Sequence, residues 1–429
     1  MTNKNVASTS AEVDQMAADW PMIDALMRGT GAMRKAGKSF LPQWPNESDD
    51  SYKNRVEASV LHPAFSKTVA IMAARPFVQD MKIEPKLPDT LSILDEDADR
   101  FNTGLQEFFA DRFKEVLSFG LTGVLIDHTV GSGRTIAEEK AMGSRPYFCT
   151  YPAQSIVGWK QRNGELLQIR LMESVIEDED QFNTMAVKQV RVLEPGKWFV
   201  YRMNDKKDWV IHEEGTTSLD FVPFVFFYGV KSSFGVGVSP LLDLAHQNIE
   251  HWQSCSDQQH ILHIARAPIL FACGFKPEAI QIGGGNVVAA EEVGAKLLWV
   301  EHSGAAINSG RESIKDLEER MNQSGAELLI KRSGNTTATQ VVSENEANKS
   351  LLQNITEEFE DGIELCLHYA SKWVGASYIP EVDIYKDFSV DAGDQDLEWI
   401  FKALEVDILT KDNVKFELSR RGVIDPELG

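Results

Sequence analysis

Three long helical patterns in the second half of this 429-residue chain restrict the folds open to it. They cover residues 239–266, 311–332 and 351–374. The first begins with Ser239 and Pro240, a good N-cap followed by the proline that suits the first helical position. At 1.5 Å per residue this helix reaches roughly 40 Å. The order is long helix, small module, long helix, polar loop, long helix.

The small module between the first two helices covers residues 267–310 and is predicted to contain β structure. Three short apolar runs, at 267–273, 286–290 and 296–302, are interrupted by the glycines 283–285. The flanking helices should run back alongside each other, so the module should project from the body of the protein. A compact, partly apolar tip in that position can be reached by a partner. An ordinary hairpin packed on its own subunit is the alternative.

The polar loop covers residues 333–350, and Val341 and Val342 are its only large apolar residues. Loops of this length inside compact domains are uncommon and are usually functional or disordered. A solvated surface linker is the other interpretation. The helix that follows has one apolar stripe, formed by Leu352, Ile355, Phe359, Ile363, Cys366, Ala370 and Trp373.

In the first half of the chain, the spacing of apolar residues changes near Gly123 from a pattern typical of helices to one typical of strands. Before it, helices are predicted over residues 11–18, 20–37, 49–60 and 105–120, the first of them capped by Ser10. After it, β-branched and aromatic runs cover 166–176, 187–193, 197–203 and 208–212 and are bounded by turns such as Asn163-Gly164. These runs predict an antiparallel meander, so the fold class is α+β. One face of the sheet must be covered by the preceding helices or by a neighbouring subunit.

The tail of the chain adds a strand-like run over 381–388 and helices over 396–407 and 411–422. From residue 354 to the end, eighteen acidic residues stand against seven basic ones. This end should repel phosphates, solvate well or meet a basic partner. The formal charge of the whole chain, −22, argues against a protein that holds nucleic acid tightly, because phosphate neutralisation needs clustered Lys and Arg. It leaves open a protein past which nucleic acid slides.

The cysteines and the hydropathy indicate where the chain is made. Four scattered cysteines without a CxxC pair, and a polar N-terminal stretch unlike a signal peptide, indicate synthesis in a reducing cytoplasm. No run approaches eighteen apolar residues, so no membrane span is predicted.

Two motifs imitate known binding loops. Gly235 and Gly237 precede a capped helix as in a phosphate loop, but no lysine follows the last glycine, so a tight strand-to-helix turn is preferred over nucleotide binding. The acidic run 95–99 begins like a calcium loop, but Arg100 stands where glycine is needed and Gln106 where the bidentate glutamate belongs. A solvated acidic turn is the expectation.

The sequence also contains few candidate metal ligands or catalytic residues. His260 and His263 are three residues apart and could share a metal, but neither has an acidic or thiol partner four residues on. Solvated or interface histidines are the better interpretation of the four on that helix. The chain has no GxSxG and no HExxH motif. We therefore expect no catalytic residue, no metal and no cofactor, although a triad assembled in space stays open.

Several stretches, taken in order, resemble the portal proteins of tailed bacteriophages, the rings through which DNA enters and leaves the head. The matching stretches are residues 36–77, "LSFGLTGVLID" at 117–127, "VPFVFFYG" at 222–229, residues 237–260, and "GAELLIKRSGNTTATQ" at 325–340. Each stretch consists mostly of residues typical of helices and turns. The order of the stretches along the chain is therefore more specific than any one of them.

The resemblance implies a portal-like layout: a helical and β wing (1–238), a stem of two helices (239–266 and 311–332) around a small α/β clip (267–310), a tunnel loop (333–350), a long wing-crossing helix with a wing strand (351–390), and a short helical C-terminal crown (391–429). It implies a subunit at the portal vertex of the virion, made in the host cytoplasm. With about forty residues after Val390, a large crown is not expected.

The same resemblance implies particular site residues. The DNA channel residues would be Lys331, Arg332, Asn335, Thr336, Thr337, Thr339 and Gln340. Uncharged polar groups of this kind can hydrogen-bond phosphates without gripping them, and the two cations add a modest attraction. The partner-docking residues of the clip would be Gly283, Gly284, Gly285, Asn286 and Trp299.

The resemblance implies that the chain forms a ring of about twelve copies. The other implied partners are double-stranded DNA, bound transiently and without sequence preference, the terminase large subunit, the head-tail adaptor, and the major capsid and scaffolding proteins. No membrane partner is expected. The alternatives are another virion structural protein, such as an adaptor or capsid component, and a nucleotide-using enzyme built around Gly235 and Gly237.

Overall fold

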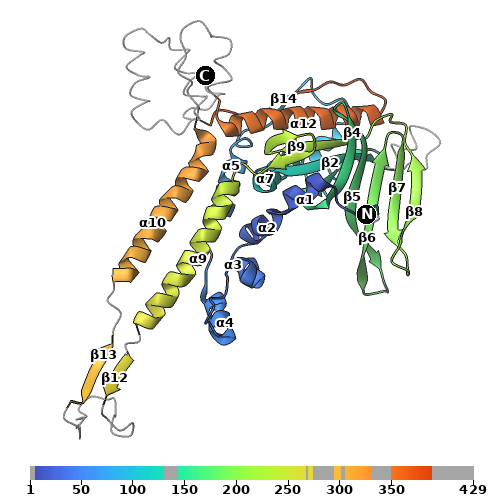
Figure 1. The fold of residues 1–429 in the computed structure, drawn as a ribbon. Coiled ribbons are helices and arrows are strands. Elements are labelled where there is room, and N and C mark those ends of the chain that lie inside the picture. The colour runs from blue at the N-terminus through green and yellow to red at the C-terminus, as the bar shows by residue number, and fades with distance from the viewer. Residues whose placement is uncertain are drawn as a thin grey trace, which may run out of the picture.

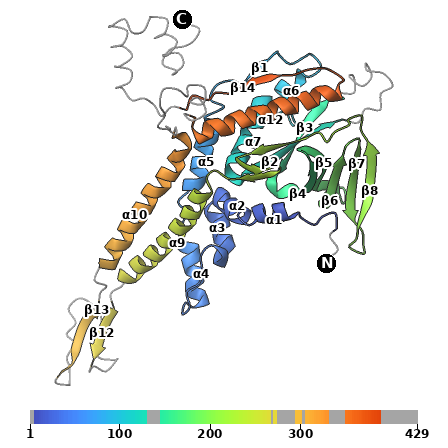
Figure 2. The same cartoon turned by 45° about the horizontal axis from the view of Figure 1, so that its top comes forward.

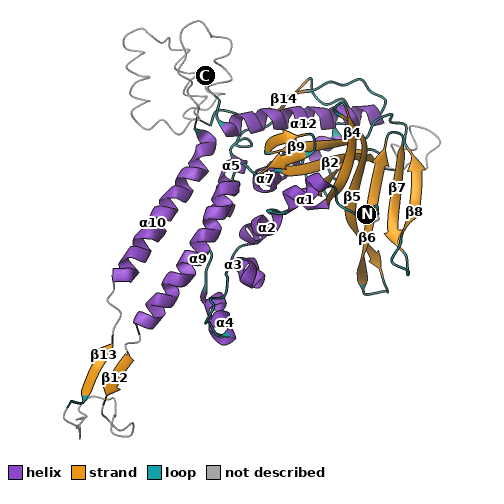
Figure 3. Ribbon diagram, in the orientation of Figure 1, coloured by secondary structure: helices purple, strands orange, loops and turns teal. Residues whose placement is uncertain are grey.

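The computed structural model describes residues 5–129, 144–266, 269–273, 294–300, 305–330 and 349–388. They form a broad body of helices and sheets from which two long helices project side by side, with two short strands beyond their ends (Figure 1). The rotated view in Figure 2 shows the same arrangement. We call the two helices the stem, and the described parts of 5–238 and 349–388 the wing. The wing combines helices and strands, as the predicted α+β class requires (Figure 3).

Short helices make up most of the first 120 residues. They are α1 (Ala11–Ala17), α2 (Trp20–Arg28), α3 (Thr30–Ala36), the 3-10 turn Gly37–Ser39, α4 (Asp49–Ala58), α5 (Ala64–Ala74), α6 (Ile93–Glu96) and α7 (Leu105–Phe119). Ser10 caps α1 by accepting a hydrogen bond from the Val13 amide, and Gly120 ends α7 in the left-handed conformation. The helices predicted before Gly123 are therefore confirmed, with the 20–37 stretch divided at Gly29 into α2 and α3. The helices predicted over 396–407 and 411–422 lie outside the described residues. The sequence patterns did not predict α5 or α6.

Two antiparallel sheets follow. The smaller has the order β3-β2-β9, from β2 (Leu121–His128), β3 (Pro146–Pro152) and β9 (Phe224–Tyr228). After the 3-10 turn Ala153–Ser155 come β4 (Ile156–Arg162), β5 (Glu165–Asp178), β6 (Thr184–Glu194), β7 (Lys197–Met203) and β8 (Trp209–Thr216), which pair in that order. The meander is confirmed. At its first turn Asn163 and Gly164 both have positive φ, as a two-residue hairpin turn requires.

Strand β2 is buried on both faces, which explains its continuous apolar run. Val124 and Ile126 face a large core shared with α7 and α12 (Leu351–Trp373). Leu121 and Leu125 face a second core under α1 and the five-stranded sheet. Neighbouring residues of a strand point to opposite faces, so a sheet covered on both sides loses the polar alternation of a half-exposed one.

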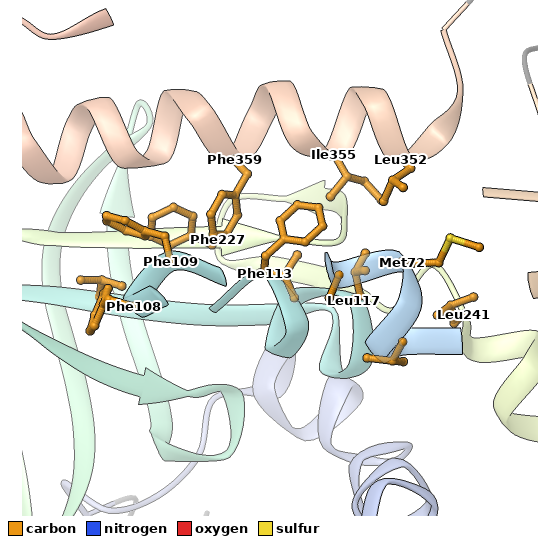
Figure 4. Close-up of a cluster of buried hydrophobic side chains, with 14 of the residues drawn as sticks. Met72, Phe108, Phe109, Phe113, Leu117, Phe227, Leu241, Leu352, Ile355 and Phe359 are labelled. Atoms are coloured by element: carbon orange, nitrogen blue, oxygen red, sulfur yellow. The ribbon is translucent and has the colours of Figure 1, made fainter. Parts of the chain in front are cut away.

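Helix α12 lies across the smaller sheet and completes the large core (Figure 4). Ser350 and Gln353 form a reciprocal capping box at its start. Its predicted stripe is confirmed, since all but the partly buried Trp373 are buried. The Phe359 ring lies 5.0 Å from that of Phe113 and 4.6 Å from that of Phe227, measured between centroids. Strand β14 (Glu381–Asp383) then pairs with β1 (Lys82–Glu84), a long-range pairing that the sequence did not predict.

The stem consists of α9 (Leu242–Ala265) and α10 (Ala305–Ala326), followed by the 3-10 turn Glu327–Leu329. Between the helices, β12 (Ile269–Cys273) and β13 (Lys296–Val300) pair antiparallel. Three predicted boundaries were wrong. Helix α9 begins three residues after Ser239, and α10 begins at Ala305, so residues 305–310 belong to the second helix rather than to the module. Helix α10 also ends at Ala326, because the chain tightens into the 3-10 turn before residue 332.

The glycines at 235 and 237 lie in a hairpin made by β10 (Val230–Ser233) and β11 (Val236–Val238). Gly235 has φ +75° and packs against Trp159, while a Cβ on Gly237 would lie 2.1 Å from the Gly120 carbonyl oxygen. The turn is thus a β-hairpin and not a direct strand-to-helix turn. Backbone packing alone requires both glycines, so they give no support to the nucleotide-binding alternative.

Candidate functional site: the helical stem

The two stem helices are joined by polar contacts that fall in reverse order along the chain. Gln247 contacts Ser324 at 3.2 Å, His251 contacts Glu318 at 3.2 Å, and Gln258 donates to the Ile307 carbonyl at 2.9 Å. This order shows that the helices run antiparallel. Trp252, Leu317 and Met321 add an apolar seam that is buried in the large core. The stem is therefore a packed helix pair at its wing end.

Asn248 fixes α9 to the wing. Its side chain is fully buried, its Oδ1 accepts from the Phe65 amide at 3.0 Å, and its Nδ2 donates to the His62 carbonyl at 2.9 Å. The first amides of a helix have no partner within that helix, so Asn248 satisfies one of them at the start of α5. One stem residue thus forms hydrogen bonds to both sides of the turn, at His62 and Phe65, that leads into α5.

Arg55 of α4 forms a second anchor near the middle of α9. Its guanidinium bonds Glu47 through Nη2 and Oε2 at 2.7 Å and through Nε and Oε1 at 2.8 Å, and it stacks over the Trp44 ring at 4.1 Å. The two charged side chains are 3% and 2% exposed. Arg55 also reaches the Ser256 hydroxyl of α9 at 3.5 Å. The hydrogen bonds from Arg55 lower the pKa of Glu47 below its ordinary value.

A pair of histidines lies where α9, α10 and the start of α5 meet. The rings of His62 and His251 are 5.1 Å apart, and the Cys255 sulfur lies 3.6 Å from His251 Nε2. Burial, and then the neighbouring His251, lower the pKa of His62, while burial raises that of Cys255. His251 is only 3% exposed and contacts Glu318 of α10, so of the two expected environments, solvated or interface, it is not the solvated one. Among the described residues no three His, Cys, Asp or Glu are placed to hold a metal ion.

The acidic run 95–99 is only partly the solvated turn that was expected. Asp97 pairs with Arg145, which also donates to the Asp97 carbonyl at 2.6 Å, and Ala98 is fully buried. The Ala98 backbone is bonded to Thr103 and Phe148. The segment therefore anchors the edge strand β3 to the helical part of the wing.

Most of the predicted site residues lie outside the described part of the chain. These are Lys331, Arg332, Asn335, Thr336, Thr337, Thr339 and Gln340 of the loop, and Gly283, Gly284, Gly285 and Asn286 of the module. Trp299 is described on β13, where its Cα is paired with that of Leu270. The roles of all twelve residues stay predictions.

The described residues on either side of the loop show where in the fold its two ends lie. Leu328 is buried in the large core just before it, and Ser350 is buried just after it as the cap of α12. Helix α12 also contacts the 3-10 turn Glu327–Leu329. Residues 331–348 therefore leave and re-enter the described fold where the stem meets the wing.

The sequence patterns missed the anchoring residues Asn248, Arg55 and Ser256. A signal was present, because the buried positions of α9 recur every three or four residues and mix apolar with polar types: Leu244, Ala245, Asn248, His251, Trp252 and Ser256. Polar residues on the buried stripe of a helix indicate partners on a neighbouring element.

Residues 240–374 match the family described as Domain of unknown function (DUF4055). The matched residues include the stem and the whole of α12 and make up less than half of the chain. No curated protein matches the chain.

Three solved structures resemble it more loosely. The neck of an empty GTA particle computed with C6 symmetry is 11% identical over 88% of this chain and 95% of that chain, with a TM-score of 0.47. The virion of a native gene transfer agent (GTA) particle is 12% identical over 90% and 98%, with a TM-score of 0.43. The neck of a native GTA particle computed with C12 symmetry has the same identity and coverage and a TM-score of 0.42.

No helix in the described part of the chain is long and apolar enough to cross a membrane.

Proposed function

We propose that the chain is a non-enzymatic ring subunit of a phage-type portal, which conducts double-stranded DNA and docks the packaging motor and the head-tail adaptor. The observation that carries the proposal is the stem, an antiparallel helix pair that projects from the wing and ends in the two-stranded β12–β13 sheet (Figure 1). Several projecting pairs arranged around an axis would enclose a channel. The anchors at Asn248 and Arg55 would hold each pair at a fixed angle to its wing.

In this proposal the loop 333–350, with Lys331 and Arg332 just before it, touches DNA. Both ends of the loop lie where stem and wing meet, which would be the inner edge of such a ring. Asn335, Thr336, Thr337, Thr339 and Gln340 would contact phosphates without reading bases, and Lys331 and Arg332 would add a weak attraction. The charge of −22 would keep moving DNA from sticking elsewhere.

The β12–β13 tip and residues 274–293 would form the clip that meets the terminase or the adaptor. The strands lie beyond the free ends of the stem helices, so a partner could approach them without displacing the wing (Figure 2). The proposed contact residues stay Gly283, Gly284, Gly285, Asn286 and Trp299. Helix α12 lies at the other end of the stem, where the capsid and scaffolding proteins would meet the wing (Figure 1).

Negative-stain microscopy and mass photometry of the purified full-length chain test this proposal. We expect closed rings of about twelve subunits with a central hole. A chain that stays monomeric at micromolar concentration and hydrolyses ATP would overturn it. Closed rings without a central hole would favour a different structural component of the virion.

A further inference from the structure

A groove of about 540 Å³ runs along α12 on the side away from β14. One wall is α12, with Glu358, Asp361 and Tyr369, and the other is the turn between β4 and β5. The floor comes from β9 and the segments on either side of it. At the middle of the helix Gly362 keeps the floor close, since a Cβ there would lie 2.5 Å from the Phe227 ring.

The groove is lined by aromatic rings that the described chain leaves half-exposed. Phe221 lies 4.5 Å from Tyr369 and Phe226 lies 5.7 Å from Phe234, between ring centroids, and none of the four is buried. Leu365 beside them is 38% exposed. Clustered apolar side chains in a concave surface mark a binding site more often than scattered ones do.

The rim of the groove carries three carboxylates, those of Glu165, Glu358 and Asp361, and one cation, Lys231, whose amine lies 5.0 Å from the centre of the Tyr228 ring. Three other carboxylates of α12 have partners: Glu357 pairs with Lys349, Glu360 with Lys386, and Glu364 accepts from the Val382 amide. Glu358 and Asp361 are exposed on the groove side and have no ion-pair partner among the described residues. An occupant should therefore carry apolar and basic side chains together, which disfavours nucleic acid.

Residues 411–421 of this chain have that composition. They contain Lys411, Lys415, Arg420 and Arg421 against two acidic residues, with Val414, Phe416 and Leu418 between them. The remainder of the chain after residue 388 is acidic, so this stretch is its one basic segment.

The described chain ends beside α12, on the side of the helix opposite the groove. Phe388 is buried, and the Lys386 carbonyl accepts from Gln353 Nε2 at 2.8 Å on the first turn of α12. The twenty-two residues between Phe388 and Lys411 could span up to about 70 Å. A helix with its side chains is only about 10–12 Å across, so the segment can reach from one side of α12 to the other.

We propose that this groove binds residues 411–421 of the same chain, with the apolar side chains on the aromatic floor and the basic side chains against Glu358 and Asp361. The docked segment would tie the C-terminal region to the wing. The proposal does not depend on the assignment as a portal.

Zero-length carbodiimide coupling of the full-length chain, followed by peptide mass spectrometry, tests the contact. We expect cross-links from Glu358 or Asp361 to Lys411 or Lys415. The Lys411→Arg/Lys415→Arg variant should lose them while keeping the charge, because a guanidinium does not couple. Glu381, exposed on the opposite side of α12, is the matched control and should give no link to either lysine. Absence of the expected links would overturn the proposal.

The source of the segment is tested by mixing isotopically light and heavy chains before coupling. Links confined to one isotope support docking within a chain, whereas mixed links would show that a second copy fills the groove and would overturn the proposal as stated. As an independent measurement, tryptic cleavage at 411–421 should be several-fold faster in Glu358→Lys/Asp361→Lys and unchanged in Glu381→Lys. Equal rates in all three proteins would also overturn it.

Discussion

Arg55 and Glu47 form a two-pronged ion pair that is almost completely withdrawn from solvent, with both hydrogen bonds shorter than 2.9 Å. Breaking a buried pair from one side leaves the other charge uncompensated, which typically costs about 3–5 kcal/mol. We therefore expect Glu47→Ala to lower the free energy of unfolding by about that amount, as measured by denaturant titration. The exposed pair Asp24–Arg28 provides the control, and Asp24→Ala should change stability by less than about 1 kcal/mol. Equal, small effects of both would show that the pair is not an anchor.

The same pair predicts a dependence of stability on pH. Its hydrogen bonds lower the folded-state pKa of Glu47, so its stabilisation is complete above the unfolded pKa, near 4.5, and is lost as the pH falls through the folded value. The difference in thermal midpoint between the wild type and Glu47→Gln should be largest near pH 7 and should shrink below about pH 4.5. A difference that stays constant from pH 7 to pH 3 would contradict the ionic role of Glu47.

Asn248 is an uncharged residue within a helix, but we expect its replacement to lower the stability of the fold. Asn248→Ala leaves the Phe65 amide and the His62 carbonyl without their side-chain partner, and an unsatisfied buried group costs about 1–3 kcal/mol. Asn54→Ala, at an exposed position of α4, should cost less than about 0.5 kcal/mol. If rings form, we also expect Asn248→Ala to disturb them in micrographs, because the stem loses its link to α5. Rings and stability both like those of the wild type would show that the link is dispensable.

The loop prediction concerns residues 333–350 and the two cations, Lys331 and Arg332, that precede them. The triple variant Thr336→Ala/Thr337→Ala/Thr339→Ala should leave the fold unchanged, within about 0.5 kcal/mol, but should impair DNA packaging or retention by otherwise normal particles. Lys331→Glu/Arg332→Glu should weaken phosphate contact, and Gln340→Lys should add a salt-sensitive attraction that slows passage. The exposed threonines Thr184 and Thr216, changed to alanine together, are the control. Normal packaging by all the loop variants would identify a surface linker.

Local patterns determined much of this fold from the sequence alone. The stripe from Leu352 to Ala370, the capping of α1 by Ser10, and the two positive φ angles at Asn163 and Gly164 depend on residues within a few positions of one another. Periodicity, caps and turn chemistry are local properties, so they can be seen before any tertiary structure is known. The order of β5, β6, β7 and β8 followed for the same reason, because each hairpin joins neighbours in the chain.

Tertiary structure decided the pairings between distant residues. The sequence does not predict that Ile83 meets Val382 across β1 and β14, or that Asn248 satisfies the amide of Phe65. From the sequence alone, the charge of Arg55 favours an exposed position, but its side chain is buried against Glu47. A charged side chain can be buried only when the folded chain supplies its partners. The acidic groove along α12 is likewise a product of packing, because its walls come from segments about two hundred residues apart. Such contacts depend on which surfaces the fold brings together, and no local pattern encodes that.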